Sequence, residues 1–236
     1  MTNILLTGAS RGIGAAAAAM LRERGARVVG QSTRGDGDAI LPCDFSRPGA
    51  ARALWDAALD AFKGNIDVLV NNAGVFAANP LVQPDAAWLA GWNETMLINL
   101  ASAAELSRLA VLHWQERGVG GRIVHVASRA GHRGDSPDHW HYAASKGGML
   151  AMHKSIARAY AQQKILSFAI TPGFVNTAMA GDYLASRGGA GLLADIPLGR
   201  VATPDEIAQI IAFCALDAPP SMTGATIDAN GASYVR

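Results

Sequence analysis

The sequence predicts a three-layer α/β fold in which a mostly parallel, doubly wound sheet of about seven strands carries helices on both faces. Three observations predict this fold class. Short apolar runs alternate with longer helical patterns along the whole chain, and a glycine-rich turn separates the first run from the first helical pattern. No linker-like stretch or composition shift divides the 236 residues, so we expect one domain over 1–236. Parallel strands joined by helices need crossovers, which cover both faces of the sheet.

The first strand-helix-strand unit is expected at the N-terminus. The apolar run 4–7 is typical of a buried strand, and residues 8–14 form the glycine-rich turn. The alanine-rich segment 15–24 favours a helix that ends at Gly25, a typical C-terminal cap. Residues 27–31 then form the second strand.

The same alternation predicts the remaining elements. Further strands are expected at 39–43, 67–71, 122–127, 165–170 and 225–228. Helices are expected at 48–62, 85–117 and 142–161, with a last one opening at Pro204, and the second of these is expected to break near Gly91. Residues 178–200 form a glycine-bearing connection that is longer than usual, so we expect a lid-like loop there.

Composition and charge exclude several classes of partner. The chain has 20 basic and 19 acidic residues, so no broad field attracts nucleic acid or an anionic membrane. Its two cysteines lack a metal-ligand spacing, and there is no secretory leader pattern or uncharged apolar run of about 18 residues. We therefore expect a cytoplasmic protein with no nucleic-acid or membrane partner.

The turn between the first strand and the first helix has the character of a phosphate-binding loop. Glycines in such a turn let the backbone approach a pyrophosphate at the helix N-terminus. The residues expected to take part are Gly8, Ser10, Arg11, Gly12, Ile13 and Gly14. A plain turn is the alternative reading, because the glycine spacing differs from GxGxxG.

The end of the second strand bears on the choice of cofactor. An acidic residue there commonly binds the adenosine ribose hydroxyls, but this segment reads Ser32, Thr33, Arg34. These side chains, with Arg11 from the turn, can donate to a 2′-phosphate that a carboxylate would repel. NADP(H) is therefore favoured, NAD(H) remains possible, and the alternative is that Arg34 only solvates a loop.

A phenol and an ammonium group occur at helical spacing in the second half of the chain. Tyr142 and Lys146 are four residues apart and therefore share one face of a helix. A nearby cation is expected to lower the tyrosine pKa from its usual value of about 10. Ser128 ends a predicted strand and can hydrogen-bond a substrate oxygen. Each residue alone also fits a solvated helix or a turn.

Together these features resemble the classical short-chain dehydrogenase/reductase family, in particular its 3-oxoacyl-ACP reductase-like members. The matching motifs occur in the family's order over essentially the whole chain: Thr7 to Gly14, Asn71 to Gly74, Asn99, Ser128, Tyr142-x-x-x-Lys146 and Pro172 to Thr177. The resemblance implies a Rossmann-type fold. It also implies a cofactor-binding part at about 1–127 and a catalytic and substrate part at about 128–236.

The resemblance assigns four catalytic roles. Tyr142 would be the acid in carbonyl reduction and the base in alcohol oxidation, and Ser128 would orient and polarise the substrate oxygen. Lys146 would lower the tyrosine pKa and hold the nicotinamide ribose, while Asn99 would support a water-linked proton relay to that lysine.

The resemblance also extends the set of cofactor contacts, which includes Tyr142 and Lys146. Asp44 would hydrogen-bond adenine. Asn72, Ala73 and Gly74 would lie along the adenosine side, and Pro172, Gly173, Val175 and Thr177 would shape the nicotinamide pocket.

The activity implied is that of an NADP(H)-dependent oxidoreductase that interconverts a ketone and a secondary alcohol. Hydride would come from nicotinamide C4 and the proton from Tyr142. The substrate would be a 3-oxoacyl thioester or another small or cyclic ketone. Alternatives are an NAD(H)-preferring alcohol dehydrogenase and a non-catalytic dinucleotide sensor or scaffold. Enoyl reduction is disfavoured, because family members with that activity have a longer Tyr-to-Lys separation.

Two segments depart from the family pattern. Residues 129–141 are unusually charged and histidine-rich, and we expect a solvated polar loop there and no metal site. Residues 34–38 are short where many members have a helix. The pocket lining is expected to mix aromatic and polar groups: Phe76, Arg129, His132, Arg133, Trp140, Phe174, Met179, Tyr183 and Leu184.

Association of subunits is expected from the helices at 85–117 and 142–161. Both carry Ala, Leu and Met on more than one face, which is more than one sheet surface needs to bury. The family resemblance implies a homotetramer or a homodimer.

Overall fold

A single seven-stranded parallel sheet organises the protein. The computed structural model describes residues 1–36, 39–177 and 189–236, excluding the side chains of residues 189, 190 and 192. The strand order is β3-β2-β1-β4-β5-β6-β7, and every neighbouring pair is parallel. The strands are β1 (Asn3–Leu6), β2 (Arg27–Ser32), β3 (Ile40–Pro42), β4 (Val68–Asn71), β5 (Gly121–Val126), β6 (Ile165–Pro172) and β7 (Thr226–Ala229). The predicted fold class is confirmed.

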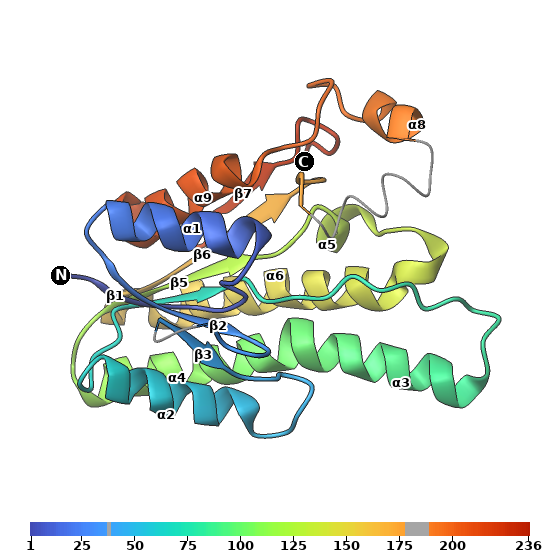
Figure 1. Cartoon of the computed structure of the whole chain (residues 1–236). Helices are drawn as coiled ribbons and strands as arrows, with labels where there is room; N and C mark the ends of the chain where they lie inside the picture. The colour runs from blue at the N-terminus through green and yellow to red at the C-terminus, as the bar shows by residue number, and fades with distance from the viewer. Residues whose placement is uncertain (37–38, 178–188) are drawn as a thin grey trace.

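Helices cover both faces of the sheet, which makes three layers (Figure 1). One face carries α1 (Gly12–Glu23) and α9 (Pro204–Ala212), and the other carries α2 (Ala50–Ala61), α4 (Ser102–Glu116) and α6 (Trp140–Tyr160). Side chains of one strand alternate between the two layers. In β1, Ile4 and Leu6 join the core beneath α1 and α9, whereas Leu5 joins the core beneath α2 and α4.

The long helical segment before β5 contains the largest departure from the predicted elements. It consists of α3 (Asp85–Met96), a π-helical turn η1 (Leu97–Ala101) and α4. The predicted break near Gly91 is wrong, because the helix runs through this glycine, where a Cβ atom would lie 2.7 Å from the Asn79 side chain. The interruption lies at η1 instead, and such π-helical turns are frequent at functional sites.

One helical stretch in the described residues, Asp85–Glu116, is long and apolar enough to cross a membrane by length and composition alone. Half of its most apolar window is buried inside the protein. Leu106 and Trp114 of α4, for example, have no exposed surface. A core helix of a globular domain passes the same test of length and composition.

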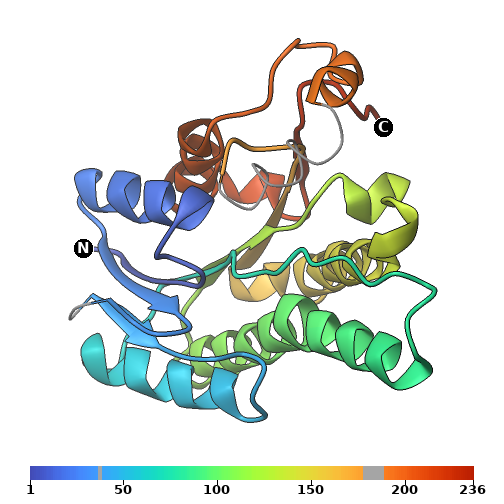
Figure 2. The ribbon, with the colours of Figure 1, turned by 45° about the vertical axis from the view of Figure 1, so that its right-hand side comes forward.

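Short helices gather at the carboxyl ends of the strands. They are α5 (Ala130–Arg133), the 3₁₀ turn η2 (Pro137–His139) and α8 (Gly189–Ala194). Figure 2 shows α5 and α8 at the same end of the molecule. Of the predicted lid-like loop at 178–200, residues 178–188 lie outside the described part of the chain. The remaining turns are η3 (Ala161–Gln163), η4 (Phe213–Asp217) and η5 (Pro220–Met222).

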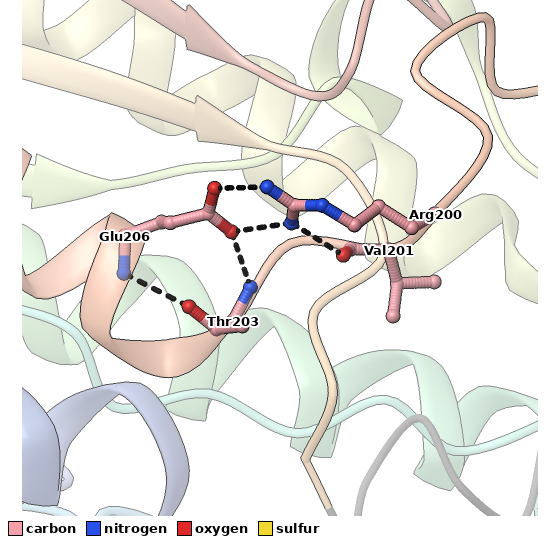
Figure 3. Close-up of polar contacts among 4 residues, drawn as sticks. All are labelled: Arg200, Val201, Thr203 and Glu206. Carbon is pink, nitrogen blue, oxygen red and sulfur yellow. Dashed lines mark hydrogen bonds and ion pairs between the residues drawn. The ribbon is translucent and has the colours of Figure 1, made fainter.

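The N-terminus of α9 is held by a capping box (Figure 3). The Glu206 backbone N–H donates to Thr203 Oγ1 over 3.3 Å, and the Thr203 N–H donates to Glu206 Oε2 over 2.7 Å. Arg200 donates to both carboxylate oxygens of Glu206, at 2.8 and 2.7 Å. The hydrogen bonds from Arg200 are the main reason that the pKa of Glu206 is lowered to about 2. The chain is therefore anchored where it enters α9.

The order in which the chain adds strands reverses at β1. Strands β2 and β3 are added on one side of it, and β4 to β7 are added on the other side. In open α/β sheets, ligands bind beyond the carboxyl ends of the strands at such a switch point. The functional site is therefore expected beyond the carboxyl ends of β1, β2 and β4.

Candidate active site

A cavity of about 1230 Å³ lies at the carboxyl ends of the strands. It is lined by segments that follow β1, β2, β3, β4, β5 and β6. The predicted site residues that line it are Gly8, Ser10, Arg11, Gly12, Ile13, Gly14, Ser32, Thr33, Arg34, Asp44, Asn72, Ala73, Gly74, Ser128, Tyr142, Lys146, Pro172, Gly173, Val175 and Thr177. Asn99 is the predicted site residue that lies behind this surface, with no exposed area.

The glycine-rich turn has the geometry of an anion cradle. Gly8 has a φ of +67°, which favours glycine, and a Cβ atom on Gly14 would lie 1.9 Å from the Gly8 carbonyl oxygen. Helix α1 begins at Gly12 with no side-chain cap and no acidic residue in its first turn. Its first N–H groups have no partner within the helix, so they can donate to a phosphate. The turn therefore fits a dinucleotide pyrophosphate.

Sequence reasoning missed the support of this turn by Gln31. The Gly8 N–H donates to Gln31 Oε1 over 2.9 Å, and Gln31 Nε2 donates to the Cys43 carbonyl over 2.6 Å. Gln31 is only 3% exposed and follows the apolar run of β2. A polar side chain at the end of an otherwise buried strand was the available clue.

The turn is also tied to the segment after β4. Asn72 Nδ2 donates to the carbonyls of Thr7 and Gly8, over 2.9 and 3.1 Å. The Thr177 methyl group lies 3.0 Å from the position of a Cβ atom on Gly12. Segments that follow β1, β4 and β6 thus meet around the same glycines.

The cavity end near β2 is polar and carries charges of both signs. Ser32 is buried and its Oγ accepts the Gly35 N–H over 3.0 Å, whereas Thr33, Arg34 and Arg11 are exposed. Asp36 and Asp44 also line this end. Hydrogen bonds from the Ser46 hydroxyl and backbone N–H lower the pKa of Asp44. No ion pair joins Arg11 or Arg34 to another described residue.

Tyr142 and Ser128 face each other at the other end of the cavity. Burial raises the pKa of Tyr142 to about 12, although a hydrogen bond with the Ser128 side chain opposes this rise. The net shift of the tyrosine pKa is therefore upward, where the sequence predicted a fall, although Lys146 lies close to the ring. The physical reason is that desolvation of the phenolate outweighs the nearby polar groups. Ser128 Oγ also accepts the Ala130 N–H over 3.1 Å, which orients the hydroxyl.

Lys146 lies behind the tyrosine ring. Its Nζ is 5.9 Å from the Tyr142 ring centroid and donates to the Val126 carbonyl over 2.9 Å. The residue is 4% exposed, and burial lowers its pKa to about 8. The ammonium group is thus held by the sheet and titrates close to neutral pH.

Asn99 connects the π-helical turn to the segments that carry the predicted catalytic residues. Its Oδ1 accepts the Val75 N–H over 2.8 Å, and its Nδ2 donates to the Val75 carbonyl and to Ser145 Oγ over 3.0 and 3.2 Å. A Cβ atom on Gly74 would lie 3.3 Å from Asn99 Oδ1 and 3.5 Å from Lys146 Nζ. Gly74 therefore allows the amide and the ammonium group to approach each other.

Two fully buried histidines lie beneath this site. The His125 and His153 ring centroids are 6.0 Å apart, and His125 Nδ1 lies 3.4 Å from Asn71 Nδ2. His153 Nδ1 is 2.8 Å from Ser167 Oγ. Burial lowers the pKa of His125 to about 3 and that of His153 to about 4. Both imidazoles are therefore neutral at physiological pH.

The histidine-rich segment 129–141 differs from the solvated loop that was predicted. It contains α5 and η2, and His139 and His141 are 4% and 2% exposed. His139 stacks on Phe76, with ring centroids 4.0 Å apart and planes 12° apart, and His141 stacks on Trp92. The rings enter the protein because aromatic partners are available on the β4–α3 segment. Within the described residues, no three His, Cys, Asp or Glu side chains form a metal-binding group.

The predicted pocket lining is partly met. Phe76, Arg129, Arg133 and Phe174 line the cavity. His132 instead stacks on Tyr234, and Trp140 is 53% exposed on the outside of α6. Met179, Tyr183 and Leu184 lie outside the described residues. Asp135, Ser136 and Asp195 also line the cavity and were not predicted.

Known proteins resemble this chain over nearly its whole length. The family profile described as enoyl-(acyl carrier protein) reductase matches residues 8–231. The 3-oxoacyl-[acyl-carrier-protein] reductases FabG of Vibrio cholerae serotype O1 and Escherichia coli K12 are each 36% identical to it, and the alignments cover 98% of this chain and 96% of each relative. Nodulation protein G of a Rhizobium species is 34% identical, over 96% of this chain and 94% of that protein.

A solved structure shows the same likeness. The crystal structure of a short-chain type dehydrogenase/reductase from Mycobacterium marinum superposes with a TM-score of 0.87 at 27% identity. The match covers 98% of this chain and 95% of that one.

Proposed function

Because this chain belongs to the short-chain dehydrogenase/reductase family, whose oxidoreductases use a nicotinamide cofactor, we propose that it interconverts a ketone and a secondary alcohol with NADP(H). One observation carries the proposal. Ser128, Tyr142 and Lys146 come together in the cavity that the uncapped glycine-rich turn also lines. A protein that only binds a dinucleotide has no need of a phenol and a buried amine beside the binding site.

The chain's own residues move the proton. When bound, the cofactor supplies hydride to the carbonyl carbon in reduction and accepts it in oxidation. In reduction Tyr142 donates its phenolic proton to the carbonyl oxygen while Ser128 holds that oxygen by a hydrogen bond. A pKa of about 12 keeps the tyrosine protonated, as an acid requires. In oxidation the same phenol must lose its proton before it can accept the proton of the alcohol.

Lys146 has two roles in this proposal. Its ammonium group lies behind the tyrosine ring, where it stabilises the phenolate that remains after proton transfer. It would also donate a hydrogen bond to the nicotinamide ribose of a bound cofactor. Asn99 holds Ser145 and the backbone beside Gly74, and so supports a water-linked relay that returns a proton to the lysine.

The remaining predicted residues would hold the cofactor along the cavity. The glycine-rich turn would bind the pyrophosphate, with Asp44 at the adenine, and Asn72, Ala73 and Gly74 would lie along the adenosine side. Pro172, Gly173, Val175 and Thr177 would enclose the nicotinamide. The cavity exceeds the ~300–1,000 Å³ typical of small-molecule sites, which supports binding of both a dinucleotide and a substrate.

The choice of NADP(H) over NAD(H) rests on the cavity end near β2. Arg11 and Arg34 are exposed there, and β2 ends in Ser32 where a ribose-binding carboxylate would otherwise be found. Arg–phosphate hydrogen bonds are charge-assisted, so these arginines favour a 2′-phosphate. Asp36 at the same end opposes it.

Steady-state kinetics with both cofactors tests the proposal. The kcat/KM with NADPH is expected to exceed that with NADH at least tenfold, and Arg34→Ala should reduce this ratio, whereas Arg52→Ala on the exposed face of α2 should not. A preference for NADH would instead indicate an NAD(H)-preferring alcohol dehydrogenase. Tight NADPH binding with no oxidation across a broad carbonyl panel would indicate a dinucleotide sensor or scaffold.

The substrate is proposed to be a ketone, with a 3-oxoacyl thioester as the first compound to assay. The names of the FabG relatives support this choice, since they describe reduction of 3-oxoacyl groups. Another small or cyclic ketone would use the same proton transfer. Full activity toward enoyl thioesters and none toward ketones would refute the proposed reaction.

Three wider features belong to the same proposal. Residues 1–236 act as one domain, because segments from 8 to 195 line one cavity. A cytoplasmic location is supported by the free, buried cysteines Cys43 and Cys214. A homotetramer or homodimer is supported by exposed apolar side chains on the long helices, such as Leu89 and Leu112. A monomer by light scattering at micromolar concentration would contradict this last point.

A further inference from the structure

We propose that Gln31 is a positioning residue for the dinucleotide cofactor. Its side-chain amide holds the glycine-rich turn and the segment 43–46, which follows β3, in one arrangement before the cofactor binds. Gln31 lines the cavity and is only 3% exposed. The inference deepens the proposed function, and it rests on that function for the identity of the cofactor.

Gln31 binds two consecutive N–H groups of the glycine-rich turn. The Gly8 N–H donates to Gln31 Oε1 over 2.9 Å, and the Ala9 N–H donates to the Gln31 backbone carbonyl over 2.8 Å. The pairing of β1 with β2 ends at Leu6 and Gly30, so these bonds continue the contact between the two strands into the turn. The turn is thereby fixed to β2 where Gly8 adopts its φ of +67°.

The same amide reaches the segment after β3. Gln31 Nε2 donates to the Cys43 carbonyl over 2.6 Å. Cys43 directly precedes Asp44, which lines the cavity. The Cys43 N–H in turn donates to the Ser32 carbonyl over 2.8 Å. One side chain therefore joins the turn proposed to bind the pyrophosphate to the segment proposed to contact the adenine.

A primary amide is the group that these two partners require. The Gly8 N–H needs an acceptor and the Cys43 carbonyl needs a donor, and an amide supplies both. A carboxylate at this position would keep the acceptor and lose the donor, and a methionine side chain of similar length would supply only a weak acceptor. Because Gln31 is buried, either loss leaves a backbone group without its partner in a place where water does not readily replace it.

The glycine-rich turn is held from its other side as well, so Gln31 completes its support. Asn72 Nδ2 donates to the Gly8 carbonyl over 3.1 Å, and Gly8 is therefore bound through both of its backbone groups. A site that is already in its binding conformation loses less freedom when the ligand binds. The apparent Kd rises when only a fraction of the molecules has that conformation. Loss of the Gln31 amide should therefore weaken cofactor binding and leave proton transfer at Tyr142 unchanged.

Binding of cofactor fragments tests the inference without turnover. Calorimetric titration with 2′,5′-ADP and with ADP measures the affinity for the adenosine half of the cofactor. Gln31→Met is expected to weaken the tighter-binding fragment about five- to fiftyfold. In steady-state assays its KM for NADPH should rise by a similar factor, whereas kcat and the KM for the ketone should change less than about twofold.

The matched control removes a different buried hydrogen-bonding group. Ser167 lies on β6 with no exposed surface, and its Oγ is 2.8 Å from His153 Nδ1. It is not among the described residues that line the cavity. Ser167→Ala should lower the unfolding temperature, as Gln31→Met does, but its affinity for the fragment should equal that of the parent protein.

A second variant gives a readout that a purely structural role would not move. In Gln31→Glu a protonated carboxyl group supplies both an acceptor and a donor, whereas the carboxylate supplies acceptors only. Burial raises the pKa of a carboxyl group, so the protonated form is accessible in mild acid. Relative to the parent protein at the same pH, fragment affinity should be close to equal at pH 5 and about tenfold or more weaker at pH 8.

The outcomes distinguish failure of this inference from failure of the proposed function. Equal fragment affinity in the parent protein, in Gln31→Met and in Gln31→Glu at both pH values overturns the inference alone. Equal losses in Gln31→Met and Ser167→Ala assign the effect to general stability and also overturn it. A parent protein that binds neither the fragments nor NADPH refutes the proposed function and this inference together. If Gln31→Met does not fold, the comparison of Gln31→Glu at the two pH values decides.

Discussion

At the scale of single residues, burial sets the protonation of the proposed catalytic pair, Tyr142 and Lys146. It raises the pKa of Tyr142 to about 12 and lowers that of Lys146 to about 8, so each group is shifted toward its neutral form. The two shifts suit a phenol that donates a proton and an amine that titrates near neutral pH. Both residues lie on α6, and Lys146 reaches across to the Val126 carbonyl at the end of β5.

Replacement of the Tyr142 phenol tests its proposed catalytic role directly. Tyr142→Phe is expected to lower kcat for ketone reduction by about 10²- to 10⁴-fold, because it removes the transferred proton while keeping the ring. NADPH affinity, measured by fluorescence titration, should change little. Tyr160→Phe at the end of α6 is the matched control and should retain full activity. Turnover by Tyr142→Phe at the parent rate would refute the proton-transfer role.

The pH dependence of reduction should report on Lys146. The ammonium form exists below its pKa of about 8, so kcat/KM for ketone reduction is expected to be highest below pH 8 and to fall above it. Pre-steady-state or steady-state rates from pH 6 to 10 measure this limb. In Lys146→Arg, whose guanidinium stays protonated, the remaining activity should lose the decline near pH 8. An unchanged limb in that variant would assign the titration to another group.

At the scale of elements, helix ends and interruptions position the site. The π-helical turn η1 places Asn99 against Val75 and Ser145, and the uncapped start of α1 faces the cavity. In contrast, α9 has a complete capping box and an arginine paired with its glutamate. The first N–H groups of α1, which would bind a phosphate, therefore have no side-chain cap. The start of α9, which packs beside α1 and supports the fold, is capped.

Loss of the α9 cap should affect stability more than catalysis. Thr203→Ala removes the acceptor for the Glu206 N–H and is expected to cost about 1 kcal/mol. For a chain of this size, that loss lowers Tm by about 2–4 °C. Differential scanning calorimetry measures the shift, and Thr203→Ser, which keeps a hydroxyl cap, should restore most of it. If both variants melt at the parent Tm, the capping box contributes nothing measurable.

At the scale of the whole molecule, the buried histidines link the fold to pH. His125 and His153 have folded pKa values of about 3 and 4, below the usual value of about 6.5. At a pH between these folded pKa values and about 6.5, the histidines of the unfolded chain are protonated to a greater extent than those of the folded protein. The contribution of the two neutral histidines to the free energy of unfolding is therefore largest above about pH 6.5 and decreases as the pH falls below that value.

Acid titration of stability tests this link. Each histidine contributes about 1.4 kcal/mol per pH unit, so the pair should lower the free energy of unfolding by about 2–3 kcal/mol between pH 6 and pH 5. Urea unfolding at a series of pH values gives the slope. In His125→Asn and in His153→Asn, the slope of unfolding free energy against pH should in each case decrease by about 1.4 kcal/mol per pH unit, which corresponds to one proton fewer taken up on unfolding. A slope that neither substitution changes would show that these residues do not cause the acid sensitivity.

Most of the fold was predictable from local pattern. The strands and main helices lie within a few residues of their predicted positions, because apolar runs and helix formers report burial and backbone preference directly. The spacing of the motifs also predicted Ser128, Tyr142 and Lys146 as candidate catalytic residues. The sheet then explains why residues so far apart along the chain can line one cavity, since parallel strands end at the same edge.

The sequence by itself determined the α/β class, the glycine-rich turn and the chemical groups at the site. Only the tertiary structure decided which of these groups are buried and what they touch. Gln31 supports Gly8, His139 stacks on Phe76, and the Tyr142 pKa rises where a fall was expected. The physical reason is that desolvation and ring packing depend on neighbours from other strands, whereas helix and strand preference depends on residues nearby in the chain.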